Sequence, residues 1–166
     1  TLDTSCGDTH LYLFLKLLHV FAVIAFLGNI TTGLFWHAHA ARTRDPKLLA
    51  HAMDGIIRSD RLFTTPGVIG ILISGFAAAI YGSLPILGTG WILWPLVAFA
   101  VSCLIFMLRL VPLQRQLRAL AEAGEHTGAF EYESYHTLAV RWEVWGAIAL
   151  VPPVAGLVLM VLKPSL

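Results

Sequence analysis

The chain has 166 residues, of which 57% are hydrophobic and only 13% charged, and its formal net charge at pH 7 is +1. An average soluble domain carries about 25% charged residues, so this composition and the mean hydropathy of +0.76 indicate an integral membrane protein. A net charge this close to zero provides no strongly basic face, which argues against a nucleic-acid partner. The lipid bilayer is therefore the first partner that the sequence predicts.

Four apolar stretches reach the roughly 20 residues that a helix needs to cross the hydrocarbon core of a bilayer. They cover about residues 11–36, 62–82, 91–112 and 139–162. The predicted fold is all-α, a bundle of four transmembrane helices that forms a single domain over residues 1–166.

The connections between these spans differ in charge. The first, "HAHAARTRDPKLLAHAMDGIIRSDR", and the third, which contains Arg115, Arg118 and Arg141, are basic, whereas the second, "GSLPILGTG", carries no charge. Short basic connections remain in the cytoplasm. We therefore expect both basic connections to be cytoplasmic, and both termini and the uncharged connection to lie outside.

The basic connections are expected to continue the helices into the cytoplasm. In "KLLAHAMDGIIR" the apolar residues fall on one side of a helix, which predicts a short interfacial helix. After Pro112, "LQRQLRALAEA" has the same periodicity, so the third span should continue as a helix and end at Gly124 as its C-cap. The fourth helix is expected to begin near Glu131, because acidic residues suit a helix N-terminus.

The first span contains two polar residues, Lys16 and His19, one helical turn apart. Lys16 is near the outer end, where its side chain can extend to the interface. His19 lies about 12 Å along the helix from Leu11. An imidazole at that depth needs a hydrogen-bond partner, a metal or a cofactor, and a hydrogen bond to a neighbouring helix is the simplest of these.

The second span has a stripe of small residues, formed by Gly67, Gly70, Ser74, Ala77 and Ala78. Such stripes usually allow two helix backbones to pack closely. The alternative is a smooth wall against which a flat macrocycle could lie.

Two consecutive prolines, Pro152 and Pro153, interrupt the fourth span. Neither has an N–H group, so the carbonyls of Ile148 and Ala149 lose their helical donors. A kink and two free acceptors are expected there.

The remaining histidines do not predict a metal site. His37 and His39 are two residues apart, which places them on different sides of a helix. His51, His126 and His136 belong to the polar connections and are expected to be solvated.

Several segments resemble a known family of bacterial membrane proteins. "FLKLLHVFAVIAFLGN", "RSDRLFTTPGV", "RLVPLQRQLRAL" and "LVLMVLKP" are similar, in this order, to members of the family called domain of unknown function 2269. The resemblance runs from about Leu11 to Pro164. It implies a multi-pass protein of the bacterial cytoplasmic (inner) membrane and implies no established activity.

The first span also resembles that of the bacterial four-helix, haem-binding protoporphyrinogen oxidase and that of copper-resistance protein D. Lys16, His19 and Gly28 match their pattern of a lysine, two apolar residues, a histidine, and an apolar run that ends in glycine. The resemblance implies that His19 is an axial ligand of haem. The third span lacks the lysine expected from the oxidase, and the arginine after the first span's glycine is missing, so oxidase activity does not follow.

These observations lead to the expectation of a small protein that binds haem b and serves electron transfer or redox sensing. His19 would be one axial ligand, and Met160, which lies at the same depth in the fourth span, the second. The ring would lie between the first two spans. The residues expected to hold it are Lys16, His19, Phe26, Gly70, Ser74 and Met160.

Two other functions remain open at this stage. A non-catalytic accessory or assembly subunit of a larger membrane complex, or a homo-oligomer, would explain the absence of a nucleophile motif, a P-loop or a zinc spacing. A copper-handling protein ranks last, because soft sites need clustered ligands and Met53, Met107 and Met160 are scattered.

Overall fold

The computed structural model describes residues 2–164, with side chains from residue 9 onward, and all regular secondary structure in this part of the chain is helical. The helices are α1 (Leu2–Ala41), α2 (Pro46–Ser59), η1 (Asp60–Thr64), α3 (Thr65–Tyr81), α4 (Gly90–Ile105), η2 (Phe106–Leu110), α5 (Val111–Thr127) and α6 (Tyr132–Leu162).

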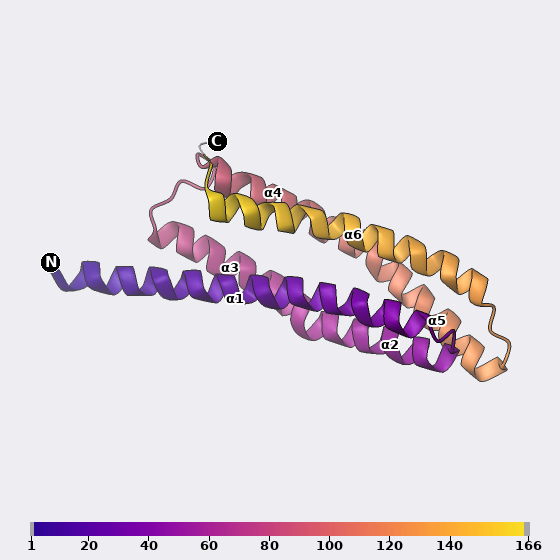
Figure 1. The fold of residues 1–166 in the computed structure, drawn as a ribbon. Helices are drawn as coiled ribbons and strands as arrows, with labels where there is room; N and C mark the ends of the chain where they lie inside the picture. Colours follow the sequence, from indigo (N-terminus) through magenta and orange to yellow (C-terminus); the bar gives the residue numbers. More distant parts are fainter. Residues whose placement is uncertain (1, 165–166) are drawn as a thin grey trace.

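Four continuous rods result, because α2, η1 and α3 follow one another without a break, as do α4, η2 and α5 (Figure 1). All four rods are long and apolar enough to cross a membrane. The prediction of an all-α bundle with four spans and helical extensions is confirmed. The side of the membrane on which the termini lie stays a prediction.

The helical extensions begin and end close to the expected residues. Asp45 caps α2, since its side chain accepts a hydrogen bond from the backbone N–H of Lys47 at 2.9 Å. At the other connection, α6 begins directly after Glu131, as predicted.

The expected C-cap at Gly124 is wrong. Helix α5 continues to Thr127, and Gly128 forms the cap with a φ of 68°, a left-handed conformation that glycine adopts without strain. Gly124 has a packing role instead, because a Cβ atom there would lie 2.5 Å from the Phe130 ring.

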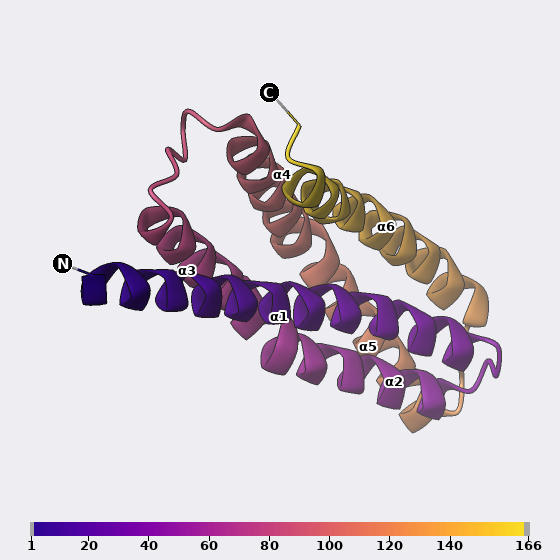
Figure 2. The same cartoon turned by 60° about the vertical axis from the view of Figure 1, so that its left-hand side comes forward.

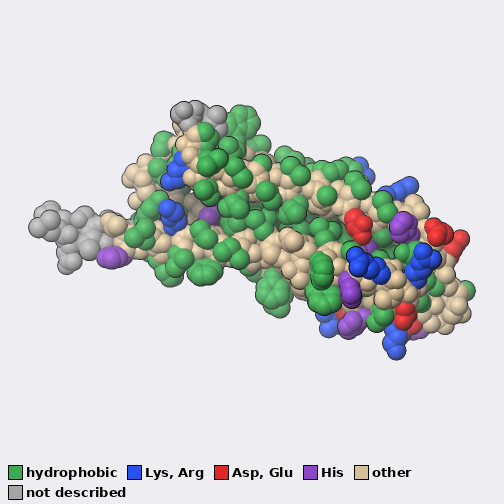
Figure 3. Space-filling view, in the orientation of Figure 1, with side chains coloured by type: hydrophobic (Ala, Val, Ile, Leu, Met, Phe, Trp, Pro, Cys, Tyr) green, Lys and Arg blue, Asp and Glu red, His purple; other side chains and the backbone are tan. Residues whose placement is uncertain are grey.

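The best-packed part of the bundle is its charged end. There α2, α5 and the first turns of α6 enclose a core that includes Leu49, Met53, Leu117, Tyr135 and Trp142, each at most 2% exposed. On the face shown in Figure 3, most charged side chains gather around this end, whereas hydrophobic side chains are spread over the opposite part.

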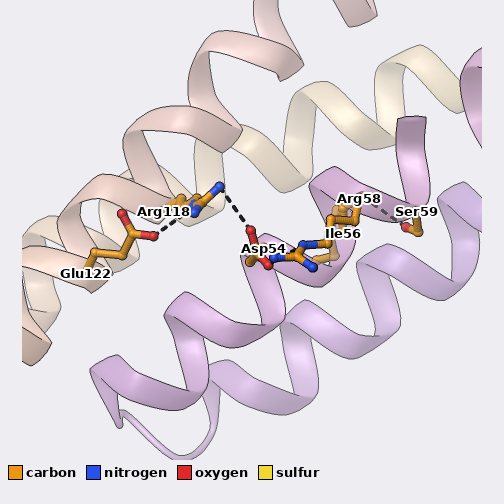
Figure 4. Close-up of polar contacts among 6 residues, drawn as sticks. All are labelled: Asp54, Ile56, Arg58, Ser59, Arg118 and Glu122. Atoms are coloured by element: carbon orange, nitrogen blue, oxygen red, sulfur yellow. Dashed lines mark hydrogen bonds and ion pairs between the residues drawn. The ribbon is translucent and has the colours of Figure 1, made fainter. Parts of the chain in front are cut away.

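Ion pairs join the two extensions at this end (Figure 4). Asp54 of α2 pairs with Arg58 at 2.6 Å and with Arg118 of α5 at 3.0 Å. Arg118 also pairs with Glu122 at 2.7 Å. These groups are partly exposed, so each pair contributes about 0–1 kcal/mol and mainly fixes how α2 faces α5.

The apolar part of the bundle divides into two helix pairs, α1 with α3 and α4 with α6. Within the described residues, no α-carbon of α3 lies within 8 Å of one in α4 or α6. The two pairs diverge away from the charged end (Figure 2). The molecule is therefore a fork, with its closed end at the charged extensions.

Candidate functional site

A cavity of about 190 Å³ lies where the two helix pairs meet. All four rods line it, and its wall is mostly apolar, as expected for a membrane-embedded ligand site. On one side of the cavity the Phe26 and Phe99 rings pack edge to face, with centroids 5.4 Å apart, and link α1 to α4.

One part of the wall is a polar cluster centred on Asp60. Its Oδ1 accepts hydrogen bonds from Asn29 Nδ2 at 3.0 Å and from the Thr64 hydroxyl at 2.8 Å, and its Oδ2 accepts one from Gln114 Nε2 at 2.8 Å. Asn29 Nδ2 also donates to Thr64 Oγ1 at 2.9 Å. All three partners donate, so both oxygens of the Asp60 carboxyl group act as acceptors in these bonds. The cluster joins α1, η1 and α5.

The sequence analysis missed Asp60 and Gln114 as site residues. Asp60 belongs to a segment that was expected to be a polar connection, and Gln114 lies 54 residues further along the chain. A signal was available for Asn29, because it shares a helical face with His19 and Phe26. An ionisable residue inside a membrane protein is by default a candidate for function.

The two short π-helical turns, η1 and η2, both contribute to this cavity. Asp60 and Thr64 come from η1, and Phe106 and Leu110 come from η2. A proline follows each turn closely, Pro66 after η1 and Pro112 after η2. Because proline has no N–H group, the regular i→i+4 bond is lost and the helix can widen by one residue. Single π-turns inside α-helices frequently mark functional sites.

Another residue of the wall contains a polar atom without a hydrogen-bond partner. Trp142 lines the cavity and is 2% exposed, and its Nε1 is the one buried side-chain nitrogen or oxygen among the described residues that has no hydrogen-bond partner. An unpaired buried donor costs about 1–3 kcal/mol. A ligand that supplies an acceptor would remove this cost.

The neighbouring His37 ring does not pair with the Trp142 indole N–H. The His37 ring is fully buried and lies 4.9 Å from the Trp142 ring, centroid to centroid. Both of its nitrogens are engaged, Nδ1 with Glu143 Oε1 and Nε2 with the Tyr135 hydroxyl, each at 3.0 Å. No lone pair of His37 is therefore available to the indole N–H. The spacing of His37 and His39 predicted no metal site, and it did not predict the burial of His37.

His19 contacts α3. Its Nδ1 lies 3.0 Å from the carbonyl oxygen of Ile71 and 3.4 Å from Ser74 Oγ. A carbonyl oxygen can only accept, so Nδ1 carries the proton and Nε2 keeps its lone pair. The expected hydrogen bond to a neighbouring helix is thus present.

The small-residue stripe of α3 packs directly against α1. A Cβ atom on Gly70 would lie 3.2 Å from the Cβ of Ala22, one on Gly67 would lie 3.2 Å from the Cβ of Phe26, and Ser74 is fully buried with its hydroxyl bonded to the Gly70 carbonyl. These distances leave no room for a macrocycle between α1 and α3. The place of the ring between these helices, with Phe26, Gly70 and Ser74 as its walls, stays a prediction that this packed contact does not support.

The remaining two predicted residues lie apart from this contact. Lys16 is exposed on α1. Met160 is half-buried near the end of α6, a helix that packs on α4, where a Cβ atom on Gly156 would lie 3.2 Å from Pro95.

The proline pair of α6 has the predicted effect on one carbonyl. The hydroxyl of Ser102, on α4, donates to the carbonyl of Ala149 at 2.6 Å. Pro153 is the residue whose missing N–H leaves that carbonyl free. Both Ser102 and Ala149 line the cavity, so this bond closes part of its wall.

Residues 13–164 match the model of a family described as predicted integral membrane protein (DUF2269). The chain belongs to this family. No curated protein and no solved structure matches it. As a DUF2269 protein it is an integral membrane protein, and its four apolar helices contact the lipid bilayer.

Proposed function

We propose that this DUF2269 protein binds a small amphipathic molecule in the central cavity, with a single ring that carries a hydrogen-bond acceptor and an apolar tail, as in a quinone. The observation that carries the proposal is the buried, unpaired indole N–H of Trp142, a residue that lines a cavity with a mostly apolar wall. A ring carbonyl would accept from that N–H.

The size of the cavity fits one ring. A cavity of about 150 Å³ holds benzene, and this one has about 190 Å³. Ile69 and Met107 line the cavity and are 53% and 64% exposed. The cavity therefore reaches the lipid-facing surface, where a tail could leave it.

The polar cluster would orient the ring. Asn29 and Gln114 donate hydrogen bonds from their side-chain amide N–H groups to Asp60. In this orientation the side-chain carbonyl oxygens of both residues point away from the Asp60 carboxyl group. A ring hydroxyl, as in a reduced quinone, could donate to one of these oxygens. Trp142 and the cluster would thus each recognise a polar group of the ring.

Calorimetric titration with 2-decyl-1,4-benzoquinone in detergent tests the proposal. Trp142→Phe removes the donor and keeps the aromatic ring, so affinity should fall about two- to tenfold, the value of one net hydrogen bond. Trp145→Phe, three residues further along α6 and outside the cavity, is the matched control and should bind like the wild type. Decylbenzene, which has no carbonyl, should bind equally to the wild type and Trp142→Phe.

Absence of quinone binding to the folded wild type, or equal binding by Trp142→Phe, would contradict the proposal. If, in addition, the purified chain bound no haem, an accessory or assembly role in a larger membrane complex would become the better reading.

One observation favours haem binding as a second candidate. The bond from His19 Nδ1 to the Ile71 carbonyl fixes the tautomer and leaves Nε2 with a lone pair, the arrangement usual for metal-ligating histidines. A haem b group, which would supply electron-transfer chemistry when bound, would have to lie outside the α1–α3 contact. Met160 would remain the candidate second ligand and Lys16 the candidate partner of a propionate.

Absorption spectra of protein made with ample haem test this second candidate. His19→Ala should abolish the Soret band in a chain that still folds, and the exposed His51→Ala should not. A colourless wild type would exclude it.

We further propose that the host membrane is the bacterial inner membrane and that the charged end of the bundle is cytoplasmic. The positive-inside rule supports this orientation, because all lysines and arginines other than Lys16 and Lys163 lie at that end.

A further inference from the structure

A second pocket, of about 440 Å³, lies on the surface of α5 and α6 and shares no residue with the central cavity. Two arginines line it, Arg109 from η2 and Arg141 from α6, together with Gln116 and Trp145. Four side chains with N–H donors thus line one hollow.

The two arginines have no acidic partner. Within the described residues, the ion pairs of the lysine and arginine side chains involve Arg58 and Arg118, and neither Arg109 nor Arg141 has a carboxylate oxygen within 4.0 Å. The guanidinium of Arg109 lies over the Trp145 ring, 5.2 Å from its centroid. This stacking positions the guanidinium at the pocket and leaves its N–H groups free. A guanidinium group suits phosphate oxygens, with which it forms paired, charge-assisted hydrogen bonds.

The surroundings of the pocket point to a lipid as the source of the phosphate. Leu108 lines the pocket and is 63% exposed. Ile148, one helical turn beyond Trp145 toward the apolar end, is 44% exposed. The pocket therefore lies where the charged end of the bundle gives way to its apolar part, and tryptophan is typical of that depth in a membrane.

We propose that this pocket binds the phosphate headgroup of an anionic phospholipid. Arg109 and Arg141 donate to the phosphate oxygens, Gln116 donates from its amide, and the acyl chains lie along the exposed side chains of Leu108 and Ile148. A free phosphate ion would use the arginines alone. A lipid uses the arginines and the apolar border.

The test is the stability of the purified protein in a neutral detergent, titrated with phosphatidylglycerol, phosphatidylcholine or inorganic phosphate. Phosphatidylglycerol should raise the melting temperature of the wild type, and the other two should have little effect. Arg109→Gln and Arg141→Gln should each weaken the apparent affinity for phosphatidylglycerol about tenfold or more, the value of one charged hydrogen bond. The double variant should respond to phosphatidylglycerol no more than to phosphatidylcholine.

The matched control is the double variant Arg42→Gln/Arg61→Gln, which removes the same charge from exposed positions outside the pocket. Its affinity should stay within about threefold of the wild type. An equal loss in this control would show that net charge, and not the pocket, attracts the lipid, and would overturn the proposal. Retention of wild-type affinity by Arg109→Gln and Arg141→Gln would overturn it too. Equal stabilisation by inorganic phosphate would overturn the assignment to a lipid. The single variants keep the test decisive if the double variant does not fold.

Discussion

The hydrogen bonds of Asp60 yield a quantitative prediction for Asp60→Ala. Asn29 and Thr64 can still bond each other at 2.9 Å, but Gln114, which is 4% exposed, is left with an unpaired amide. An unsatisfied buried donor costs about 1–3 kcal/mol. The lost bonds to Asn29 and Thr64 add to this cost, and the removal of a buried carboxylate offsets part of it. We expect a loss of about 2–4 kcal/mol in the free energy of unfolding.

Asp60→Asn separates the geometry of the hydrogen bonds from the charge. The new amide oxygen can accept from Asn29 and Thr64. Its amide nitrogen can donate to Gln114, provided that the Gln114 amide turns by 180° to present its oxygen. All bonds are then remade in a weaker, neutral form. The expected loss is below about 1.5 kcal/mol, because the burial of a charge is also relieved.

Thermal unfolding in detergent, followed by circular dichroism, checks both values. At about 2–4 °C per kcal/mol for a chain of this size, Asp60→Ala should lower the melting temperature by about 4–16 °C. Asp54→Ala on α2 is the control, since its ion pairs are partly exposed and contribute less than about 1 kcal/mol each. Wild-type stability of Asp60→Ala would refute the reasoning. Equal loss in Asp60→Asn and Asp60→Ala would show that the charge, not the set of donors, matters.

Three further predictions test the fold. In a chain whose native Cys6 is replaced by serine, a cysteine placed at Ser83 should react with an impermeant thiol reagent from outside intact cells, and one at His126 should not; the opposite pattern would reverse the orientation. Gly75→Ala should lower the free energy of unfolding by about 1–2 kcal/mol, because the new Cβ would lie 3.0 Å from a ring atom of His19. Gly28→Ala should not lower it, because no heavy atom lies within 4 Å of a Cβ at that position. Ser102→Ala should lower the free energy of unfolding by about 1–3 kcal/mol, because it leaves the buried carbonyl of Ala149 unpaired. Pro153→Ala restores a backbone donor for this carbonyl, so the double variant should lose less than Ser102→Ala alone. If the losses of the two single variants add up in the double variant, the assignment is contradicted.

The spans and their extensions could be predicted because they depend on local composition and periodicity. Twenty apolar residues form a helix in a bilayer whatever surrounds them, and the apolar side of α2 follows from its own sequence. The end of α5 was misplaced by four residues, because Gly124 and Gly128 both resemble a C-cap. The choice between them depends on Phe130, which packs against Gly124.

The candidate site could not be predicted because its residues meet only in three dimensions. Asp60 and Gln114 are 54 residues apart, and each belongs to a segment that resembles a solvated connection. His37 is 106 residues from Glu143, and its spacing to His39 places the two histidines on different sides of a helix without showing which side is buried. A polar residue near the end of a span is buried if the neighbouring helices extend beyond the membrane and cover it, and otherwise it is solvated. How far those helices extend cannot be derived from the sequence around the polar residue.

The position of the cavity within the fork connects the two parts of the molecule. At the closed end, the core around Leu49 and Leu117 holds all four rods together, whereas beyond the cavity each helix pair stands alone. The Phe26–Phe99 contact and the Ser102–Ala149 bond lie at this junction. A ligand between Trp142 and the Asp60 cluster would contact both helix pairs and should therefore fix the angle between them. Site-directed spin labels at Ile80 on α3 and Leu157 on α6 would report that angle as a distance. A narrower distance distribution with 2-decyl-1,4-benzoquinone than without it is the expected result, and an unchanged distribution would show that the two pairs do not respond to the cavity.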